Sequence, residues 1–510
     1  MSDAENPNRI LNFRPLFFAA VGFISGVALF ESISRSGPSE SAKLILFCVS
    51  LVSFCGLCVS FSVTRRYVGA VLFGAALLGF ARMALASPDI ISKGDYDLTG
   101  TVYSVSATDE SVVTIGDASL NDSKLKYRVK LTVSDGPMPR VGDRIEAKVS
   151  AQNPTRRFGT YDERLNLLSN GVSVTAKGSG VKIISSHGLP AREFFLSLKA
   201  FLHERIDACF GDSAPIVAGF LLGDKTGIDE ADTESFRSTG TVHLLTLSGF
   251  HVALLCSLIF FLLPKRYPLL RLVIISAFLV VYCCVTAFSP SLVRASVMCF
   301  IMLLADALEE RRDSLSALSL SALIILLASP YKLWSVGFRL SFAATFGIIV
   351  TSNSIRIGTN SRFTARLLRS LIATLGATAA TMLIIAQYFG YFAVYNMLAN
   401  IAAVPIFSAA IALSFTILVI SIPIPAIGAA LGFIPDKIIS FGMLVLKGIS
   451  SLPYAEIEVP APSGSSVVLM LLLLFSVSSF VLRPPKKRLL IGGAVFLLFT
   501  ASLLSVIIKL

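Results

Sequence analysis

The polar and charged residues that could line a path or bind a ligand are concentrated in one stretch, Gly219 to Val252, which reads GFLLGDKTGIDEADTESFRSTGTVHLLTLSGFHV. The stretch starts apolar, and its next section is polar and carries the charged side chains of Asp224, Lys225 and Arg237. Its last part is apolar, but polar or small residues interrupt it at His243, Thr246, Ser248, Gly249 and His251. Polar groups at membrane depth are costly, so they normally face a bundle interior or a water-filled path. The stretch is therefore predicted to line a permeation path, with the charged part near its mouth.

A phosphate-binding loop and a zinc site both fit this stretch poorly. Gly219 to Thr226 nearly matches the phosphate-binding pattern G-x-x-x-x-G-K-[ST], but Asp224 replaces its second glycine. Without that glycine the backbone cannot close around a phosphate. His243 and His251 are eight residues apart and would share a helix face, but zinc needs further ligands, and the remaining histidines lie upstream. No cofactor and no metal ion are predicted, which leaves hydrogen bonding in a polar channel or ordinary packing for the two histidines.

Two arginines occur within or at the edge of later apolar runs, Arg294 in SPSLVRASVM and Arg339 in SVGFRLSFAATFGI. An arginine near the centre of a membrane helix costs about 2.5–3.5 kcal/mol on insertion scales. Snorkelling of these side chains to the membrane surface competes evenly with a place on the path. Both arginines, together with Asn400, are secondary candidates for the lining.

The composition indicates the element type that must position these residues. Of 510 residues, 54% are hydrophobic and only 15% are charged, whereas soluble proteins carry about 25% charged residues. Many apolar runs reach the roughly 20 residues that span hydrocarbon. The sequence therefore predicts a polytopic α-helical membrane protein. Most of the net charge of +12 is explained by Lys and Arg in cytoplasmic loops rather than by nucleic-acid binding.

The predicted spans follow the apolar runs: Leu16–Phe30, Leu44–Val63, Val68–Ala86, Val242–Leu263, Leu270–Ala287, Leu292–Leu308, Leu315–Ser329, Leu333–Val350, Leu371–Phe389, Met397–Ile420, Ala426–Leu446, Val467–Val481 and Leu490–Ile508. The pair Arg65 and Arg66 is expected in a cytoplasmic loop between the second and third spans. The N-terminus is then cytoplasmic, whereas the soluble region after the third span and the C-terminus are outside. Cys209 is expected on that outer face, and the mostly intramembrane cysteines imply no disulfide framework.

A soluble β domain is predicted between residues 91 and 185. Apolar residues alternate with polar ones from Leu125 to Val133, and Ile145, Ala147 and Val149 repeat the pattern. Five or six strands in about 90 residues suit a small OB-like barrel. Between Asp95 and Ser185 the sequence has 12 Lys and Arg and 11 Asp and Glu, so the domain carries almost no net charge. A role as a spacer or gate is therefore as well supported as direct contact with DNA.

The predicted domains are N-terminal transmembrane helices over 1–90, the extracytoplasmic β domain over 91–185, an interfacial helix and polar segment over 186–241, and a channel domain over 242–510. The helix predicted at Ala191–Phe210 is amphipathic and should lie against membrane lipid.

The stretch HLLTLSGFHV resembles the signature of the ComEC competence family, channels that admit single-stranded DNA across the bacterial inner membrane. Further segments resemble that family in the same order: FLLGDK, SLVRASVM, GFRLSFAATFGI and NMLANIAAVPI. NPTRRFGTYDERLNLLSNGV resembles the end of the family's OB-like extracytoplasmic domain. The likeness covers about residues 15 to 480.

This resemblance implies a non-enzymatic inner-membrane channel for DNA uptake in natural transformation. Its partners would be single-stranded DNA, a periplasmic DNA receptor, a cytoplasmic DNA-translocating ATPase and a separate nuclease. Three features depart from the family: Arg339 stands where glutamine is common, the barrel has no cysteine, and no histidine follows His251, so the metallo-β-lactamase-like domain of many members is expected to be absent. A secondary transporter of a small anionic solute and a non-conducting membrane scaffold are the alternatives.

Overall fold

The computed structural model describes residues 14–35, 63–107, 111–135, 139–154, 157–158, 161–186, 190–264, 266–310, 312–354, 361–478 and 492–500. The predicted span Leu44–Val63 lies outside these residues except for Val63, and the span Leu490–Ile508 lies partly outside them. The chain forms two compact units. One comprises Pro15–Leu196 and Ala322–Val336, and the other comprises Met1–Arg14, Ser197–Ser321 and Gly337–Leu510.

Two apolar helices begin the first unit, α1 (Pro15–Arg35) and α3 (Val63–Leu85). They pack closely because α1 presents glycine to α3: a Cβ on Gly22 or Gly26 would overlap the backbone of the facing helix. Small residues allow such close packing of helices in membranes. Arg65 and Arg66 lie in the first turn of α3 and not in a loop as predicted, but they do precede the apolar span Tyr67–Leu85. Their cytoplasmic position stays a prediction.

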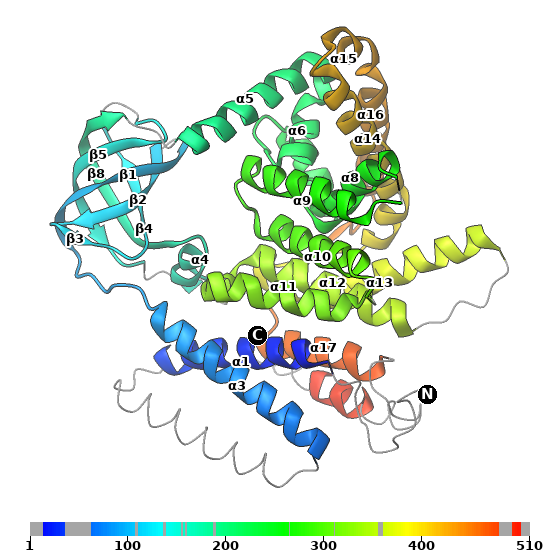
Figure 1. The fold of residues 1–510 in the computed structure, drawn as a ribbon, viewed down its shortest axis with the longest axis horizontal. Helices are drawn as coiled ribbons and strands as arrows, with labels where there is room; N and C mark the ends of the chain where they lie inside the picture. The colour runs from blue at the N-terminus through cyan, green and yellow to red at the C-terminus, as the bar shows by residue number, and fades with distance from the viewer. Residues whose placement is uncertain are drawn as a thin grey trace. The chain divides into compact units, whose positions relative to one another are not determined.

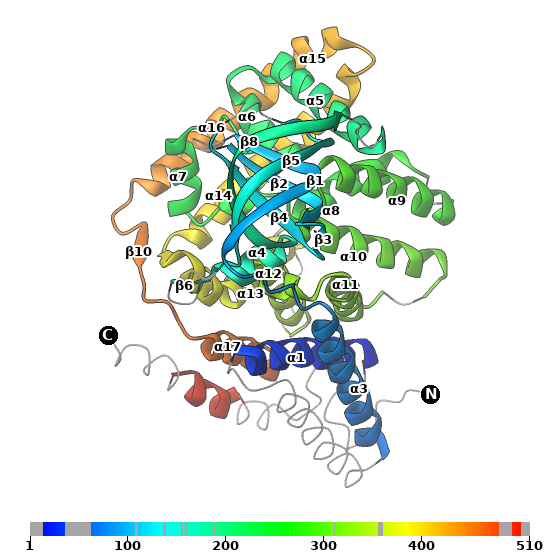
Figure 2. The same ribbon diagram turned by 90° about the vertical axis from the view of Figure 1, so that its left-hand side faces the viewer.

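A small barrel follows α3 in the same unit (Figure 2). Its strands are β1 (Gly94–Ala107), β2 (Ser111–Leu120), β3 (Ser123–Lys124), β4 (Arg128–Val133), β5 (Asp143–Gln152) and β8 (Val172–Ser186). They are ordered β1-β5-β8-β4-β2-β3, and an additional pairing of β1 with β2 closes the sheet. The pairing of β4 with β8 is parallel, and the others are antiparallel. Two short strands, β6 (Arg157–Phe158) and β7 (Tyr161–Asp162), form a separate pair.

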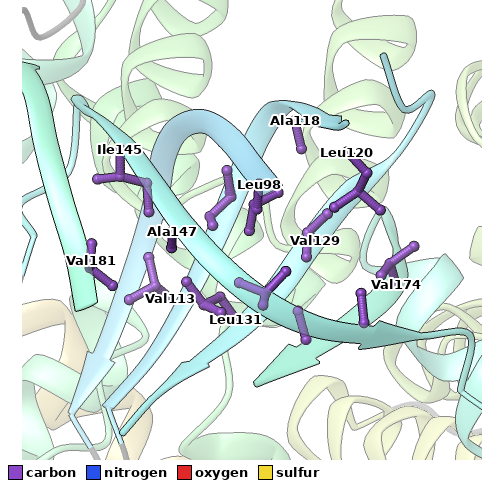
Figure 3. Packing of buried hydrophobic residues seen from close by; sticks show 14 of the residues in the cluster. Leu98, Val113, Ala118, Leu120, Val129, Leu131, Ile145, Ala147, Val174 and Val181 are labelled. Carbon is purple, nitrogen blue, oxygen red and sulfur yellow. The ribbon is translucent and has the colours of Figure 1, made fainter. Parts of the chain in front are cut away.

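Alternation of side chains fills the barrel with aliphatic residues (Figure 3). Along β5 every second residue is buried, including the predicted inward residues Ile145, Ala147 and Val149. The alternation predicted from Leu125 begins as a strand only at Arg128. Just before β4, the Tyr127 hydroxyl donates a hydrogen bond of 2.5 Å to the Ala86 carbonyl beyond α3.

Further contacts hold the barrel within its unit. On the helix α4 (Glu163–Ser169), Arg164 forms an ion pair of 3.4 Å with the buried Glu31 of α1. The ring of Tyr127 packs edge-on against Tyr331 in the 3₁₀ segment η4 (Pro330–Trp334). The strand region is therefore joined to the apolar helices by specific polar and aromatic contacts, and not only by the chain that connects them.

The second unit is built from helices (Figure 1). Its regular elements are the end of α5 (Pro190–Phe210), η2 (Gly211–Ser213), α6 (Ala214–Leu222), α7 (Glu230–Ser238), η3 (Val242–Leu244), α8 (Gly249–Leu262), α9 (Pro268–Val285), α10 (Pro290–Ala307), part of α11 (Ser314–Ala328), most of α12 (Val336–Ser354), α13 (Arg362–Phe389), β9 (Tyr391–Ala393), α14 (Asn396–Ser421), α15 (Pro425–Leu431), α16 (Phe433–Ser450), β10 (Glu456–Glu458) and α17 (Gly464–Val477). A helical stretch at residues 492–500 ends the described chain.

One buried ring joins several of these helices. Phe407 of α14 is fully buried and lies 5.5 Å from the rings of both Phe220 in α6 and Phe236 in α7. Gly442 of α16 packs against the same ring. The short polar helix α7 is thereby fixed to the apolar helices, which holds the charged part of the predicted path in a defined place.

Six helices among the described residues are long and apolar enough to cross a membrane: Pro15–Ser34, Tyr67–Leu85, Pro268–Val285, Thr364–Phe389, Asn396–Ser421 and Pro425–Ser450. Four shorter apolar helices accompany them: Gly249–Leu262, Ser314–Ala328, Val336–Ser352 and Gly464–Ser476.

Two predicted spans are wrong as single helices. Val242–Leu263 is divided into η3 and α8, and Leu333–Val350 into η4 and α12. The predicted span Ala426–Leu446 lies within the long apolar stretch Pro425–Ser450, in which α15 and α16 meet at Gly432 with helical backbone geometry. An apolar run reports hydrophobicity alone, whereas the helix boundaries within it depend on capping side chains and glycine.

Candidate functional site

The break between η3 and α8 is made by a local cap. Ser248 is the N-cap of α8, and its backbone N–H donates to Nδ1 of His251 over 3.3 Å. The Ser248 hydroxyl lies 2.9 Å from the same nitrogen. A glutamate or glutamine at the third helical position commonly accepts this N–H in a capping box. His251 takes that role here, so the Ser-Gly-Phe-His sequence starts a helix inside an apolar run.

His251 is the more deeply buried of the two histidines of this stretch. It is fully buried, and its ring lies 6.4 Å from that of Phe220. Within the described chain its Nε2 makes no hydrogen bond of good geometry, although the Leu244 backbone and the His243 side chain lie close enough to act on the ring electrostatically. Nδ1 of the ring is thus hydrogen-bonded, whereas Nε2 lacks a well-formed hydrogen bond in the described chain.

His243 lies in η3, just before the break, and is exposed. The Thr246 hydroxyl donates to the His243 carbonyl over 3.2 Å and holds the turn that follows.

Gly249 lies directly against Arg294 of α10. A Cβ on Gly249 would be 2.6 Å from Nη2 of Arg294, so the guanidinium occupies the space beside this residue. Arg294 is 5% exposed, and its Nε donates to the Ser341 hydroxyl of α12 over 2.6 Å. That hydroxyl also pairs with Ser291 over 2.8 Å. Three helices therefore meet at a buried cation.

Asp224 lies in the turn after α6, and both of its carboxylate oxygens have partners. One carboxylate oxygen accepts from Lys199 Nζ over 3.1 Å and lies 3.2 Å from Nε2 of His203, both on α5. The other accepts from the backbone N–H and the hydroxyl of Thr226. Partial burial acts to raise the pKa of Asp224, but these hydrogen bonds outweigh it and hold the pKa well below its usual range. Burial lowers the pKa of the neighbouring Lys225.

Arg237 on α7 is also paired. Its guanidinium reaches Glu456 of β10 over 3.0 Å and Glu234 over 3.6 Å, and it lies 4.7 Å above the ring of Tyr391 in β9. Lys447 of α16 forms an ion pair of 2.8 Å with Asp232 on the same helix. Arg237 and Asp232 thus fasten α7 to its neighbours, and Arg237 is not a free cation.

Asn400 belongs to a series of hydrogen-bonded polar groups that the sequence analysis did not identify. Its amide donates to the backbone and side-chain oxygens of Asn396 over 2.8 and 2.9 Å. Asn396 donates to the Gly240 carbonyl over 3.0 Å, and Thr378 donates to Asn396. Gly240 has a left-handed φ of +70°. Asn396 therefore fixes the turn before the His243 segment, and its place in the NMLAN sequence is the signal that could have identified it.

The predicted lining residues fall into separate groups. Ser248 and His251 bond each other, and Gly249 between them lies against Arg294. Asp224 and Arg237 each belong to another cluster, and Asn400 belongs to the turn at Gly240. The guanidinium of Arg339 on α12 lies 5.7 Å from the ring centre of Tyr388. Among the described residues no group of three or more His, Cys, Asp or Glu could hold a metal ion.

Helices of spanning length, a discontinuous apolar segment and a small barrel define the class: a multi-pass helical membrane protein with a barrel domain. The sequence profile of the competence protein family matches residues 220–484, which is more than half of the chain, and the chain belongs to this family. The resemblance of HLLTLSGFHV and its neighbouring segments to the ComEC competence family is thereby confirmed.

Three curated relatives share part of the chain. It is 31% identical over 200 residues to ComE operon protein 3 of Bacillus subtilis, which is 39% of this chain and 25% of that protein. It is 29% identical over 199 residues to an uncharacterized protein of Aquifex aeolicus, which is 38% of this chain and 45% of that protein. It is 23% identical over 242 residues to Recombination protein 2 of Haemophilus influenzae, which is 45% of this chain and 30% of that protein. The matches span less than half the length of each relative, and no solved structure matches the chain.

Proposed function

We propose that the chain is the membrane channel of a DNA-uptake system, which passes single-stranded DNA inward during natural transformation. Membership in the competence protein family supports this role, as do the names of the two relatives, ComE operon protein 3 and Recombination protein 2. The chain acts by conducting a polyanion and not by catalysing a reaction. It resides in the bacterial inner membrane with its N-terminus in the cytoplasm.

The observation that carries the proposal is the break at Ser248–Gly249 in an apolar run. Non-helical backbone at membrane depth is tolerated only where it is buried in protein or lines a water-filled cavity. The exposure of His243 favours the second case for the segment just before the break. The path therefore runs past His243 and the start of α8.

The barrel is proposed to be an OB-like domain on the periplasmic face. Five strands closed on themselves, with one parallel pair, support an OB-like arrangement. Its near-even charge favours a spacer or gate over tight DNA contact. The strand would come from a periplasmic receptor after a separate nuclease has removed its complement, and a cytoplasmic ATPase would pull it in.

A secondary transporter of a small anionic solute is the second candidate. Discontinuous helices whose N-termini point at an anionic substrate are typical of such transporters, and the start of α8 beside Arg294 fits that description. The size of the transported anion separates the two functions.

Deletion of the gene tests the proposal. We expect the deleted strain to bind fluorescently labelled duplex DNA at its surface and in the periplasm, but to import none into the cytosol and to yield no transformants. Restoration of the full chain should restore both. Unchanged transformation in the deleted strain would refute the DNA channel and leave the anion transporter as the function to test.

A further inference from the structure

Arg294 is a buried cation for which the described residues supply no anion. Its partners are neutral: Nε donates to Ser341, Nη1 faces the thioether of Met298 over 3.4 Å, and the guanidinium carbon lies 5.9 Å from the ring centre of Phe342. No hydrogen bond or ion pair joins it to a carboxylate in the described chain. Burying a charge is costly unless it is paired. The third nitrogen, Nη2, makes no hydrogen bond there and points at Gly249.

The start of α8 adds positive potential at the same place. The first N–H groups of a helix have no intrahelical acceptor, and those of Gly249 and Phe250 have no other partner among the described residues. The helix dipole places a partial positive charge at this end. Helix α8 has 14 residues and is long enough to develop that dipole. Nη2 of Arg294 on α10 therefore lies beside the positive end of α8.

Helix α10 contributes a second positive end. It begins at Pro290, about one turn before Arg294, and runs for 18 residues. The hydroxyl of its N-cap, Ser289, is buried without a hydrogen-bond partner in the described chain. The N-terminus of α10 therefore adds partial positive charge about one turn from Arg294, and positive helix ends favour a bound anion.

We propose that Arg294 and the N-terminus of α8 form a binding site for one phosphate oxyanion, and that its ligand is a backbone phosphodiester of the transported strand. The ligand identity rests on the proposed function, whereas the oxyanion chemistry rests on the geometry. A guanidinium and backbone N–H groups bind phosphate oxygens without reading bases. Such a contact suits a channel that passes any sequence.

Gly249 has a defined part in this site. A side chain there would begin 2.6 Å from Nη2, in the space between the guanidinium and the helix start. Glycine is required there because the guanidinium itself fills the space against the start of α8, and a side chain would displace it. The glycine of the Ser-Gly-Phe-His sequence is therefore explained by the close approach of Arg294 as well as by the helix boundary.

The test uses the purified full chain in lipid nanodiscs and a fluorescein-labelled 15-mer of thymidylate, titrated at several salt concentrations. Arg294→Met keeps the side-chain volume and removes the charge, and Arg294→Lys keeps the charge. Arg312→Met is the matched control, because it removes an arginine whose side chain is 62% exposed. We expect Arg294→Met to weaken binding about tenfold and to reduce the salt slope by about 0.7, the loss of one phosphate contact on a single strand.

Further outcomes separate the sources of the phosphate. Arg294→Lys should bind with intermediate affinity, and Arg312→Met should match the wild type. Equal affinity and slope for wild type and Arg294→Met would overturn the site while leaving the DNA channel intact. If inorganic phosphate raises the thermal midpoint of the wild type but not of Arg294→Met, and the 15-mer does not bind, the phosphodiester assignment is overturned together with the DNA channel. If phosphatidylglycerol in the nanodisc raises the thermal midpoint of the wild type but not of Arg294→Met in the absence of the 15-mer, and the 15-mer does not bind, the site belongs to lipid and the strand contact is overturned.

Discussion

At the scale of single residues, the roles of Ser248, Gly249 and His251 differ from one another. Ser248 and His251 cap α8 through their mutual hydrogen bonds. Gly249 contributes by having no side chain, because Arg294 fills the adjacent space. A substitution at Gly249 therefore tests the space beside the guanidinium without removing a hydrogen bond.

Gly249→Leu is expected to abolish most DNA import while the protein still accumulates in the membrane. Forcing extra atoms into a packed contact costs about 1–3 kcal/mol, enough to displace the guanidinium, so we expect transformation to fall by roughly tenfold or more. The matched control is Gly448→Leu on α16, where a Cβ meets nothing within 4 Å. Normal import by Gly249→Leu at normal membrane levels would show that this contact is not on the path.

At the scale of elements, Asp224 joins α5 to the turn after α6. It receives hydrogen bonds from Lys199 of α5 and from Thr226 in its own turn. The turn is also packed from the other side, because Gly223 lies against Leu247 of the segment before α8. Asp224 therefore holds a helix and a turn in place for the site, and its own carboxylate is not available to a solute.

Asp224→Asn is expected to destabilise the purified chain at neutral pH by about 1–2 kcal/mol, the net contribution of partly exposed charge-assisted hydrogen bonds. Because the folded-state pKa of Asp224 lies below its ordinary value, its stabilisation is fully present above the unfolded pKa of about 3.9 and is lost as the pH falls further. The thermal midpoints of wild type and variant should differ at pH 7 and converge towards low pH. Asp207→Asn, at an exposed position of α5, is the control and should match the wild type throughout.

The elements that could be predicted from the sequence are those with a local pattern. Ile145, Ala147 and Val149 alternate with polar neighbours, and they do face the barrel core. The break before α8 was not predicted, because its cap depends on histidine acting in place of glutamate at the third helical position. The pairing of Arg237 was not predicted either, because its partner Glu456 is 219 residues away in the chain. Distant partners leave no local pattern.

At the scale of the whole molecule, the orientation in the membrane decides which way the strand moves. The start of α13 carries Arg366 and Arg369, whereas the connection from its end to α14, residues 390–395, has no Lys or Arg. The positive-inside rule predicts that the start of α13 is cytoplasmic and that the β9 connection is outside. Cys209 cannot report this orientation as the sequence alone suggested, because it is buried against Gly428.

Two exposed positions can report it instead. Lys124 on β3 has a side chain 73% exposed, and Arg312 has one 62% exposed. We expect Lys124→Cys to react with a membrane-impermeant maleimide applied from the periplasm, and Arg312→Cys to react only after the membrane is permeabilised. Labelling is measured above the wild-type background from the native cysteines. If the reactivities are reversed, the barrel is cytoplasmic, a strand arriving from outside would meet the other face first, and inward passage as proposed would fail.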